Sequence, residues 1–296
     1  MRQRAVVITR RTELDELLDR HSTRGQAEFF LKSRGRTLED VQTRHDHLTA
    51  AVATINRAIP QDWATASVER EDLSRFLFAP EDTVVVVGQD GLVANTAKYV
   101  TTQLVVGVNP EPGINPGVLV RHTPEKASHI VGKLATQPAS APEIEFLTMV
   151  EGQLDDGQTI RALNELFIGH PTHQSARYTL SGGQYSERQS SSGLIVGTGT
   201  GATGWLASIS RDRGGRAMPG RDQAALAWFV REAWPSPATG ASLTEGMLLE
   251  NDVLNVTVES DQLVAFGDGI EADRLLLGWG QNLQIRVSGQ RFNLAA

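Results

Sequence analysis

A run of four valines, Val84–Val87, stands directly before the sequence Gly88-Gln89-Asp90-Gly91. An unbroken run of β-branched apolar residues is typical of a strand buried on both faces, as in a parallel sheet that helices cover on both sides. The residues after this turn, Leu92–Val100, predict a helix. The run therefore predicts an α/β fold for the first half of the chain.

The turn between this strand and this helix is a candidate phosphate-binding site. Unpaired N–H groups at a helix N-terminus and the helix dipole both favour anions. Asp90 is unusual there, because phosphates repel a carboxylate unless it faces a metal ion or accepts a proton from an attacking hydroxyl. The alternative is that Asp90 only caps the following helix, which is a common role for aspartate.

A second glycine-rich segment, Leu194–Gly204, begins as an apolar run and ends in alternating threonine and glycine. Glycines let a ligand approach the main chain, and successive N–H groups in such a loop form a concavity for anions. The alternative is a turn that only joins two strands. Trp205 follows the loop directly, and it either stacks on a base or closes a core.

Two further pairs of residues are candidates for a site. Asn164 and Glu165 precede an apolar run, where an amide beside a carboxylate can hold two ribose hydroxyls; an ordinary surface pair is the alternative. Asp268-Gly269 predicts a hairpin turn. His170 and His173 flank a proline, but no further ligand completes a metal site around them.

Composition narrows the class of protein. The chain has 296 residues, a net charge of −7 and no cysteine. Its length allows two domains, and its acidic balance predicts no attraction to nucleic acid or to anionic membranes. The absence of cysteine excludes disulfides and thiolate metal sites. The apolar run near the N-terminus is too short for a signal peptide or a spanning helix, so we expect a cytoplasmic protein.

The pattern of elements changes at the proline-rich segment 138–142. We expect an α/β domain over residues 1–137, which carries the phosphate turn, and a mainly β domain over residues 138–296. The predicted helices are 12–20, 26–32, 37–59, 92–100 and 125–135, and the predicted strands are 4–9, 83–87, 104–108, 143–150, 165–169, 176–181, 194–196, 253–258, 263–266 and 283–287.

In this order, the motifs resemble those of the NAD kinases, within the superfamily of diacylglycerol kinase-like proteins. Gly88-Gln89-Asp90-Gly91 is similar to the family's Gly-Gly-Asp-Gly motif, and Leu163-Asn164-Glu165 to its Asn-Glu motif. Thr198–Gly204 is similar to its second glycine-rich loop, and Asp268-Gly269 to a late Asp-Gly pair. Trp205, in place of a common tyrosine, resembles the mitochondrial-type branch.

The resemblance implies an α/β domain and a β-rich domain with a cleft between them for ATP and NAD, and Mg²⁺ bound with ATP. It implies that Asp90 is the catalytic base for the 2′-hydroxyl of the adenosine ribose. It also implies a homodimer. The residues expected to contact the nucleotides are Gly88, Gln89, Gly91, Asn164, Glu165, Thr198, Gly199, Thr200, Gly201, Ala202, Thr203, Trp205 and Asp268.

Two positions differ from the family pattern. Gln89 stands where the family has its second glycine, and Leu92 where a threonine commonly follows. Two alternatives to an NAD kinase therefore stay open. One is an inactive nucleotide-binding regulatory protein of the same fold, and the other is a kinase that acts on a different nucleoside or polyol.

Overall fold

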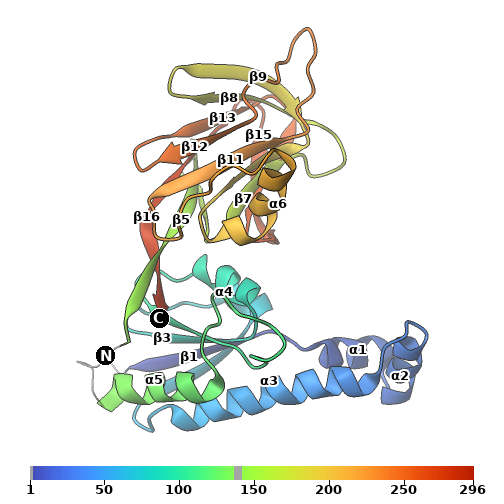
Figure 1. Ribbon diagram of the computed structural model, residues 1–296, viewed down its shortest axis with the longest axis vertical. Helices are drawn as coiled ribbons and strands as arrows, with labels where there is room; N and C mark the ends of the chain where they lie inside the picture. Colours follow the sequence, from blue (N-terminus) through green and yellow to red (C-terminus); the bar gives the residue numbers. More distant parts are fainter. Residues whose placement is uncertain (1–2, 137–141) are drawn as a thin grey trace. The chain divides into compact units, whose positions relative to one another are not determined.

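The computed structural model describes residues 3–136 and 142–296 of the chain (Figure 1). The chain forms two compact units. Residues up to Ile144 and the last four residues, Asn293–Ala296, form the first unit, and Glu145–Phe292 form the second. The sequence instead predicted a division at 137/138 and placed the last residues in the second domain. Most of the segment 138–142 lies outside the described residues.

The first unit is an α/β layer structure. Its elements in chain order are β1 (Arg4–Thr9), α1 (Glu13–His21), α2 (Arg24–Lys32), α3 (Leu38–Ala58), β2 (Ala64–Glu69), the 3₁₀ helix η1 (Arg70–Arg75), β3 (Thr83–Val87), α4 (Asp90–Ala97), β4 (Leu104–Val108) and α5 (Pro124–Thr136).

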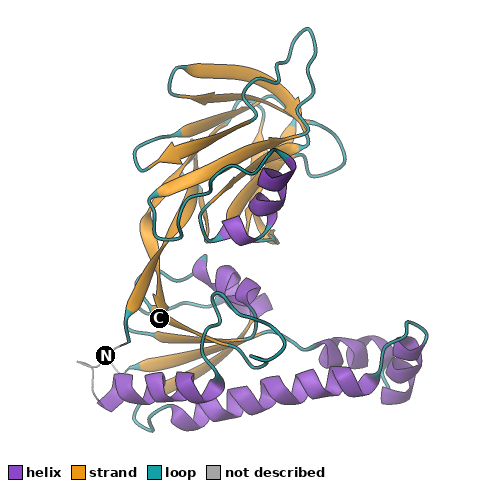
Figure 2. Ribbon diagram, in the orientation of Figure 1, coloured by secondary structure: helices purple, strands orange, loops and turns teal. Residues whose placement is uncertain are grey.

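The strands of this unit are parallel, in the order β2-β1-β3-β4, and Leu294 near the chain end pairs with Val105 of β4. Helices α3 and α5 lie along one face of the sheet and α4 along the other (Figure 2). All of β3 is buried, which confirms the strand predicted from the valine run. Helix α4 begins at Asp90 and not at Leu92, so the prediction placed its start two residues late.

The second unit contains antiparallel sheets, and its first and last strands extend at one end into residues of the first unit. Its elements are β5 (Ile144–Leu154), β6 (Thr159–Ala162), β7 (Glu165–Gly169), β8 (Ala176–Gly182), β9 (Tyr185–Ser191), β10 (Gly193–Gly197), the 3₁₀ helix η3 (Gly201–Thr203), α6 (Trp205–Asp212), β11 (Ala225–Arg231), β12 (Glu245–Leu249), β13 (Leu254–Val258), β14 (Gln262–Gly267), β15 (Ile270–Gly278) and β16 (Asn282–Ala295).

One six-stranded sheet of this unit has the order β12-β11-β10-β7-β14-β15. Its inner face packs against β5, β6, β8, β13 and β16 through one large apolar core, and α6 covers part of its outer face. The mixed α/β first unit and the antiparallel second unit agree with the fold class predicted from the sequence. Among the described residues, no helix is both long enough and apolar enough to cross a membrane.

Candidate functional site

The turn at Gly88–Gly91 lies between the carboxyl end of β3 and the N-terminus of α4, and Gln89 and Gly91 in it are exposed. Gln89 occupies the N-cap position of α4 and its side chain makes no capping hydrogen bond. The side chain of Gln89 is exposed and has no hydrogen-bond partner in the described part of the chain. The interpretation of Asp90 as the helix cap is therefore wrong, because Asp90 is the first residue of the helix itself.

The carboxylate of Asp90 binds a distant loop. Its Oδ1 accepts the N–H groups of Leu119 at 2.8 Å, Val120 at 2.9 Å and Val118 at 3.1 Å, and its Oδ2 accepts the Val118 N–H at 2.9 Å. This loop lies tightly on β4, since a Cβ on Gly107 would come within 2.1 Å of the Leu119 carbonyl oxygen. Asp90 thus joins the glycine turn to the loop after β4, and its Oδ2 has one hydrogen-bond partner among the described residues.

In the second unit, the strand pairing brings the other motifs together. Glu165 begins β7 and pairs with Gly197 at the end of β10, while Leu166 pairs with Gly267 at the end of β14. The glycine loop then bonds back to the start of β7. Thr198 donates its N–H to the Asn164 carbonyl at 2.9 Å and its hydroxyl to the Leu163 carbonyl at 2.5 Å.

Asp268 holds the Asn-Glu segment in place. Its carboxylate accepts the N–H groups of Leu163 and Asn164, both at 2.8 Å, and of Glu165 at 3.3 Å. Asp268 and Gly269 both have positive φ, 52° and 69°, between β14 and β15, which confirms the predicted hairpin turn. In this structure the Asp268 carboxylate is an orienting group for residues 163–165.

The side chains of Asn164 and Glu165 are free to bind a ligand. Neither has a hydrogen bond to another described residue, although both are half-buried. Burial, and secondarily the charge of Asp268, raise the pKa of Glu165 to about 7. A carboxyl group that titrates near neutral pH can accept or donate a hydrogen bond to a hydroxyl, which suits it to sugar recognition.

Two glycines of the loop lie too close to neighbouring backbone for any side chain to replace them. A Cβ on Gly201 would lie 2.4 Å from the Asn164 carbonyl oxygen, and one on Gly199 would lie 2.3 Å from the Gly220 carbonyl oxygen. Thr200 is buried between them, and its hydroxyl has no hydrogen-bond partner within the described chain. Ala202 is half-buried and Thr203 is exposed at the end of the loop.

Trp205 packs against aromatic residues of the sheet. Its ring stacks on Phe167 with centroids 5.8 Å apart, and Phe167 in turn contacts Phe266 at 5.1 Å. The guanidinium of Arg231 lies 5.4 Å from the Trp205 ring centroid. These are packing contacts, and 38% of the Trp205 residue stays exposed.

The described residues contain no group of three or more His, Cys, Asp or Glu side chains that could hold a metal ion. His170 instead accepts the N–H of Thr172 at 3.1 Å. A metal ion that enters with a nucleotide would therefore take most of its ligands from phosphate oxygens. Such binding needs no dedicated protein cage.

Replacing Glu165 by glutamine is expected to flatten the dependence of stability on pH. The pKa of about 7 lies above the ordinary value of 4.5. Between these values the folded protein holds a proton that the unfolded chain has released, so the free energy of unfolding falls as pH rises. Urea unfolding of the wild type and of Glu165→Gln between pH 5 and 8 measures this. An unchanged slope in Glu165→Gln, or an equal change in the exposed control Glu39→Gln, contradicts the expectation.

No protein-family model and no curated protein matches the sequence significantly. Among solved structures, the chain is similar to an NAD kinase from Archaeoglobus fulgidus in complex with ATP, with a TM-score of 0.58 and 15% sequence identity. The match covers 99% of this chain and 93% of that chain. At this identity the likeness concerns the fold alone. The chain therefore has an NAD kinase-like fold.

Proposed function

We propose that this protein is an ATP-dependent NAD kinase, which phosphorylates the 2′-hydroxyl of the adenosine ribose of NAD to give NADP. The observation that carries the proposal is the half-buried pair Asn164 and Glu165, whose side chains are free while Asp268 and Thr198 hold their backbone. The similarity in fold to an NAD kinase crystallised with ATP supports the same function.

Two sets of residues bind the two nucleotides in this proposal. Asn164 and Glu165 bind hydroxyl groups of NAD, and the loop Thr198–Thr203 together with Trp205 completes that site. The turn Gly88–Gly91 binds ATP phosphates through the exposed N–H groups at the start of α4. Mg²⁺, when bound with ATP, neutralises charge on the phosphate oxygens.

Asp90 would position the acceptor hydroxyl and take its proton. Phosphoryl transfer depends mainly on positioning and charge stabilisation, so the base needs a fixed direction. The N–H groups of residues 118–120 provide that direction by holding Oδ1. Within the described part of the chain Oδ2 accepts one N–H, that of Val118, so Oδ2 is the oxygen that would take the hydroxyl proton.

The direct test is to incubate the purified chain with Mg-ATP and NAD and to measure NADP with an NADP-specific dehydrogenase. NADP formation above a no-enzyme blank supports the proposal and excludes an inactive regulatory protein. ADP formation that requires a different nucleoside or polyol contradicts NAD as acceptor. Nucleotide binding without any transfer leaves the inactive alternative, for which the free side chain of Gln89 in the phosphate turn is the specific structural argument.

Gly91→Ala is expected to retain the fold and to lower activity. Apart from the adjacent residues and the helix's own backbone, no atom lies within 4 Å of the position that a Cβ on Gly91 would take. Alanine stabilises a helix relative to glycine by up to about 1 kcal/mol. The packing of the chain therefore does not require a glycine at this position, whereas a phosphate that approaches the backbone would need the space that a Cβ fills. We expect kcat/KM for ATP to fall by at least about tenfold, equal to about 1.4 kcal/mol.

The matched control for Gly91→Ala is Gly132→Ala in α5, where a Cβ also has open space. This variant should keep full activity and gain similar stability. Unchanged kinetics in Gly91→Ala would show that no phosphate comes close to this turn.

We further propose that the protein acts as a cytoplasmic homodimer, without nucleic-acid or membrane partners. Light scattering after size-exclusion chromatography is then expected to give twice the chain mass of 32.1 kDa at micromolar concentration. A mass of 32.1 kDa across that range contradicts the dimer.

A further inference from the structure

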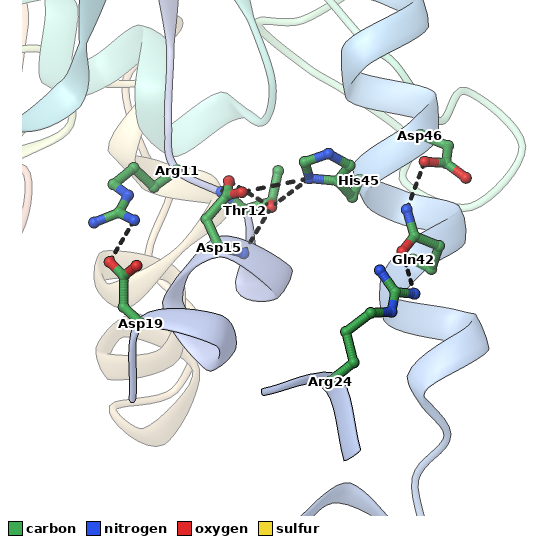
Figure 3. Close-up of polar contacts among 8 residues, drawn as sticks. All are labelled: Arg11, Thr12, Asp15, Asp19, Arg24, Gln42, His45 and Asp46. Carbon is green, nitrogen blue, oxygen red and sulfur yellow. Dashed lines mark hydrogen bonds and ion pairs between the residues drawn. The ribbon is translucent and has the colours of Figure 1, made fainter. Parts of the chain in front are cut away.

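Helices α1 and α2 form a small subdomain on the first turns of α3, away from the parallel sheet (Figure 1). Their apolar contacts form a core of their own, made by Leu14, Leu17, Ala27, Leu31 and Val41. Polar contacts add to it (Figure 3). Thr12 bonds to His45 of α3 at 2.8 Å, and Arg24 donates to Gln42 of α3 at 2.8 Å. The two short helices are thus held firmly on α3.

A hollow of about 600 Å³ lies between the last turn of α1 and the outer side of α2. The ionisable side chains that line it are Arg20, His21 and Arg34, and none of its lining residues is acidic. The chain as a whole carries a net charge of −7. A concave surface whose ionisable side chains are all basic favours an anionic ligand, even in an acidic protein.

Several polar groups of this hollow are unused. The guanidinium of Arg20, the hydroxyl of Ser22 and the amide of Gln26 make no hydrogen bond or ion pair with any other described residue. The Nε2 atom of His21 is buried, also without a partner in the described chain. Arg34 uses Nη1 to bond the Phe30 carbonyl and the Ser33 hydroxyl, at 3.2 and 3.0 Å. Exposed donors that line one hollow and have no partner in the described protein are what an anion would engage.

The backbone of α2 adds donors to the same place. Thr23 caps the helix by accepting the N–H of Gln26 at 3.3 Å. The N–H groups of Arg24 and Gly25 precede it in the first turn and have no intrahelical acceptor. Apart from the adjacent residues and the helix's own backbone, no atom lies within 4 Å of the position of a Cβ on Gly25, so a ligand can reach the backbone there.

An exposed aromatic side chain borders these donors. Phe29 lies one helical turn after Gly25 on the same side of α2 and is 77% exposed. The ring of Phe30 beside it is already covered: Cζ of Arg34 lies 3.7 Å from its centroid, and the centroid of the His21 ring lies 4.5 Å from it. Phe29 therefore offers a free apolar face next to an anion site, which suits a ligand that joins a phosphate to a planar ring.

We propose that this hollow binds a phosphate monoester attached to a planar base, as in a nucleoside monophosphate. Arg20, Ser22 and the first N–H groups of α2 bind the phosphate, and Phe29 stacks on the base. The site is separate from the turn at Gly88–Gly91, and it does not depend on the function proposed above.

The test is an amide NMR titration of the full chain, labelled with ¹⁵N at glycine and phenylalanine. The ligands are 5′-AMP, adenosine and inorganic phosphate, each added alone. We expect 5′-AMP to shift the amide signals of Gly25 and Phe29 with saturation, and each of the other two ligands to bind more weakly. Signals of Gly88 and Gly91 report separately on the phosphate turn, so binding at the two places is distinguished.

Variants test the role of each group. Arg20→Ala is expected to weaken binding of 5′-AMP and of phosphate by about tenfold, because a charge-assisted hydrogen bond is lost. Phe29→Ala is expected to weaken 5′-AMP and to leave phosphate unchanged. The control is Lys32→Ala, a cation on the same helix that pairs with Glu28 outside the hollow and should change neither affinity.

Three results would overturn the proposal. The first is the absence of saturable shifts at Gly25 and Phe29 with 5′-AMP. The second is equal affinity for 5′-AMP and phosphate with no effect of Phe29→Ala, which indicates a simple anion site. The third is a loss of affinity in Lys32→Ala as large as in Arg20→Ala. If an acidic peptide shifts these amide signals and 5′-AMP does not, the partner is a protein segment and the nucleotide proposal fails.

Discussion

Replacing Asp90 by asparagine is expected to lower the rate of phosphoryl transfer by roughly 10²–10⁴-fold, the range typical for loss of a general base. The amide keeps the size of the side chain but cannot take the hydroxyl proton. Its carbonyl oxygen can still accept the N–H groups of Leu119 and Val120, which Oδ1 accepts in the wild type. In the wild type, Oδ2 accepts the N–H of Val118. In the variant an NH₂ group takes the place of Oδ2, so two donors face each other and this hydrogen bond is lost.

Asp90→Ala separates the chemical role of this side chain from its structural role. It removes the carboxylate oxygens that accept the N–H groups of residues 118–120. Leu119 and Val120 are buried there, at 3% and 2% exposure. A buried N–H left without a partner costs about 1–3 kcal/mol. We therefore expect Asp90→Ala to be measurably less stable to urea than Asp90→Asn, while both lose activity.

Measurements on these two variants are kcat, urea unfolding, and the affinity for ATP and NAD by calorimetry. Asp156→Asn is the control, because Asp156 also accepts a backbone N–H, that of Gln158 at 3.0 Å, but in a hairpin of the second unit. It should keep full activity. If Asp90→Asn retains wild-type turnover, Asp90 has only a structural role, as the acceptor that connects the glycine turn to the loop after β4.

The second large effect is expected from Gly201→Ala, which should reduce NAD binding beyond detection and destabilise the second unit. The new Cβ would lie 2.4 Å from the carbonyl oxygen and 2.8 Å from the carbonyl carbon of Asn164. These are backbone atoms at the start of β7, so relief requires the glycine loop to move away from Asn164. Overpacking of this kind typically costs about 1–3 kcal/mol.

Gly289→Ala is the matched control, because it places a Cβ in open space on β16 of the same unit. Calorimetric titration with NAD and urea unfolding of both variants give the comparison. Wild-type affinity in Gly201→Ala would show that NAD does not need the contact between the loop and the Asn-Glu segment. A loss of the same size in Gly289→Ala would show that the assay only reports general destabilisation.

Local patterns were enough to predict several elements of this fold. The buried strand β3 follows from the run Val84–Val87, since only a strand covered on both faces is uniformly apolar. The helix predicted over residues 12–20 is α1, where Thr12 is the N-cap and forms a capping box with Asp15, a pattern that depends on a spacing of three residues. The hairpin at Asp268-Gly269 follows from the backbone preferences of those two residues.

Other elements were missed because local patterns did not mark them. The apolar strand β11, Ala225–Arg231, was not predicted, although it pairs with β10 along five residues. The edge strands β12 and β15 alternate weakly, and their pairing partners decide their conformation. Helix α4 starts at Asp90 because Gln89 takes the cap position, against the usual preference for aspartate there.

The sequence by itself determined which residues belong to the candidate site, because the motifs are short and each lies beside a predictable strand. Only the tertiary structure decided which contacts those residues make. The carboxylate of Asp90 accepts backbone N–H groups 28–30 residues away, in the loop at 118–120. The carboxylate of Asp268 accepts those of residues 163–165, up to 105 residues away. Such partners depend on strand order and register, which no local pattern encodes. The same register leaves Asn164 and Glu165 with free side chains, and burial then raises the pKa of Glu165 to about 7.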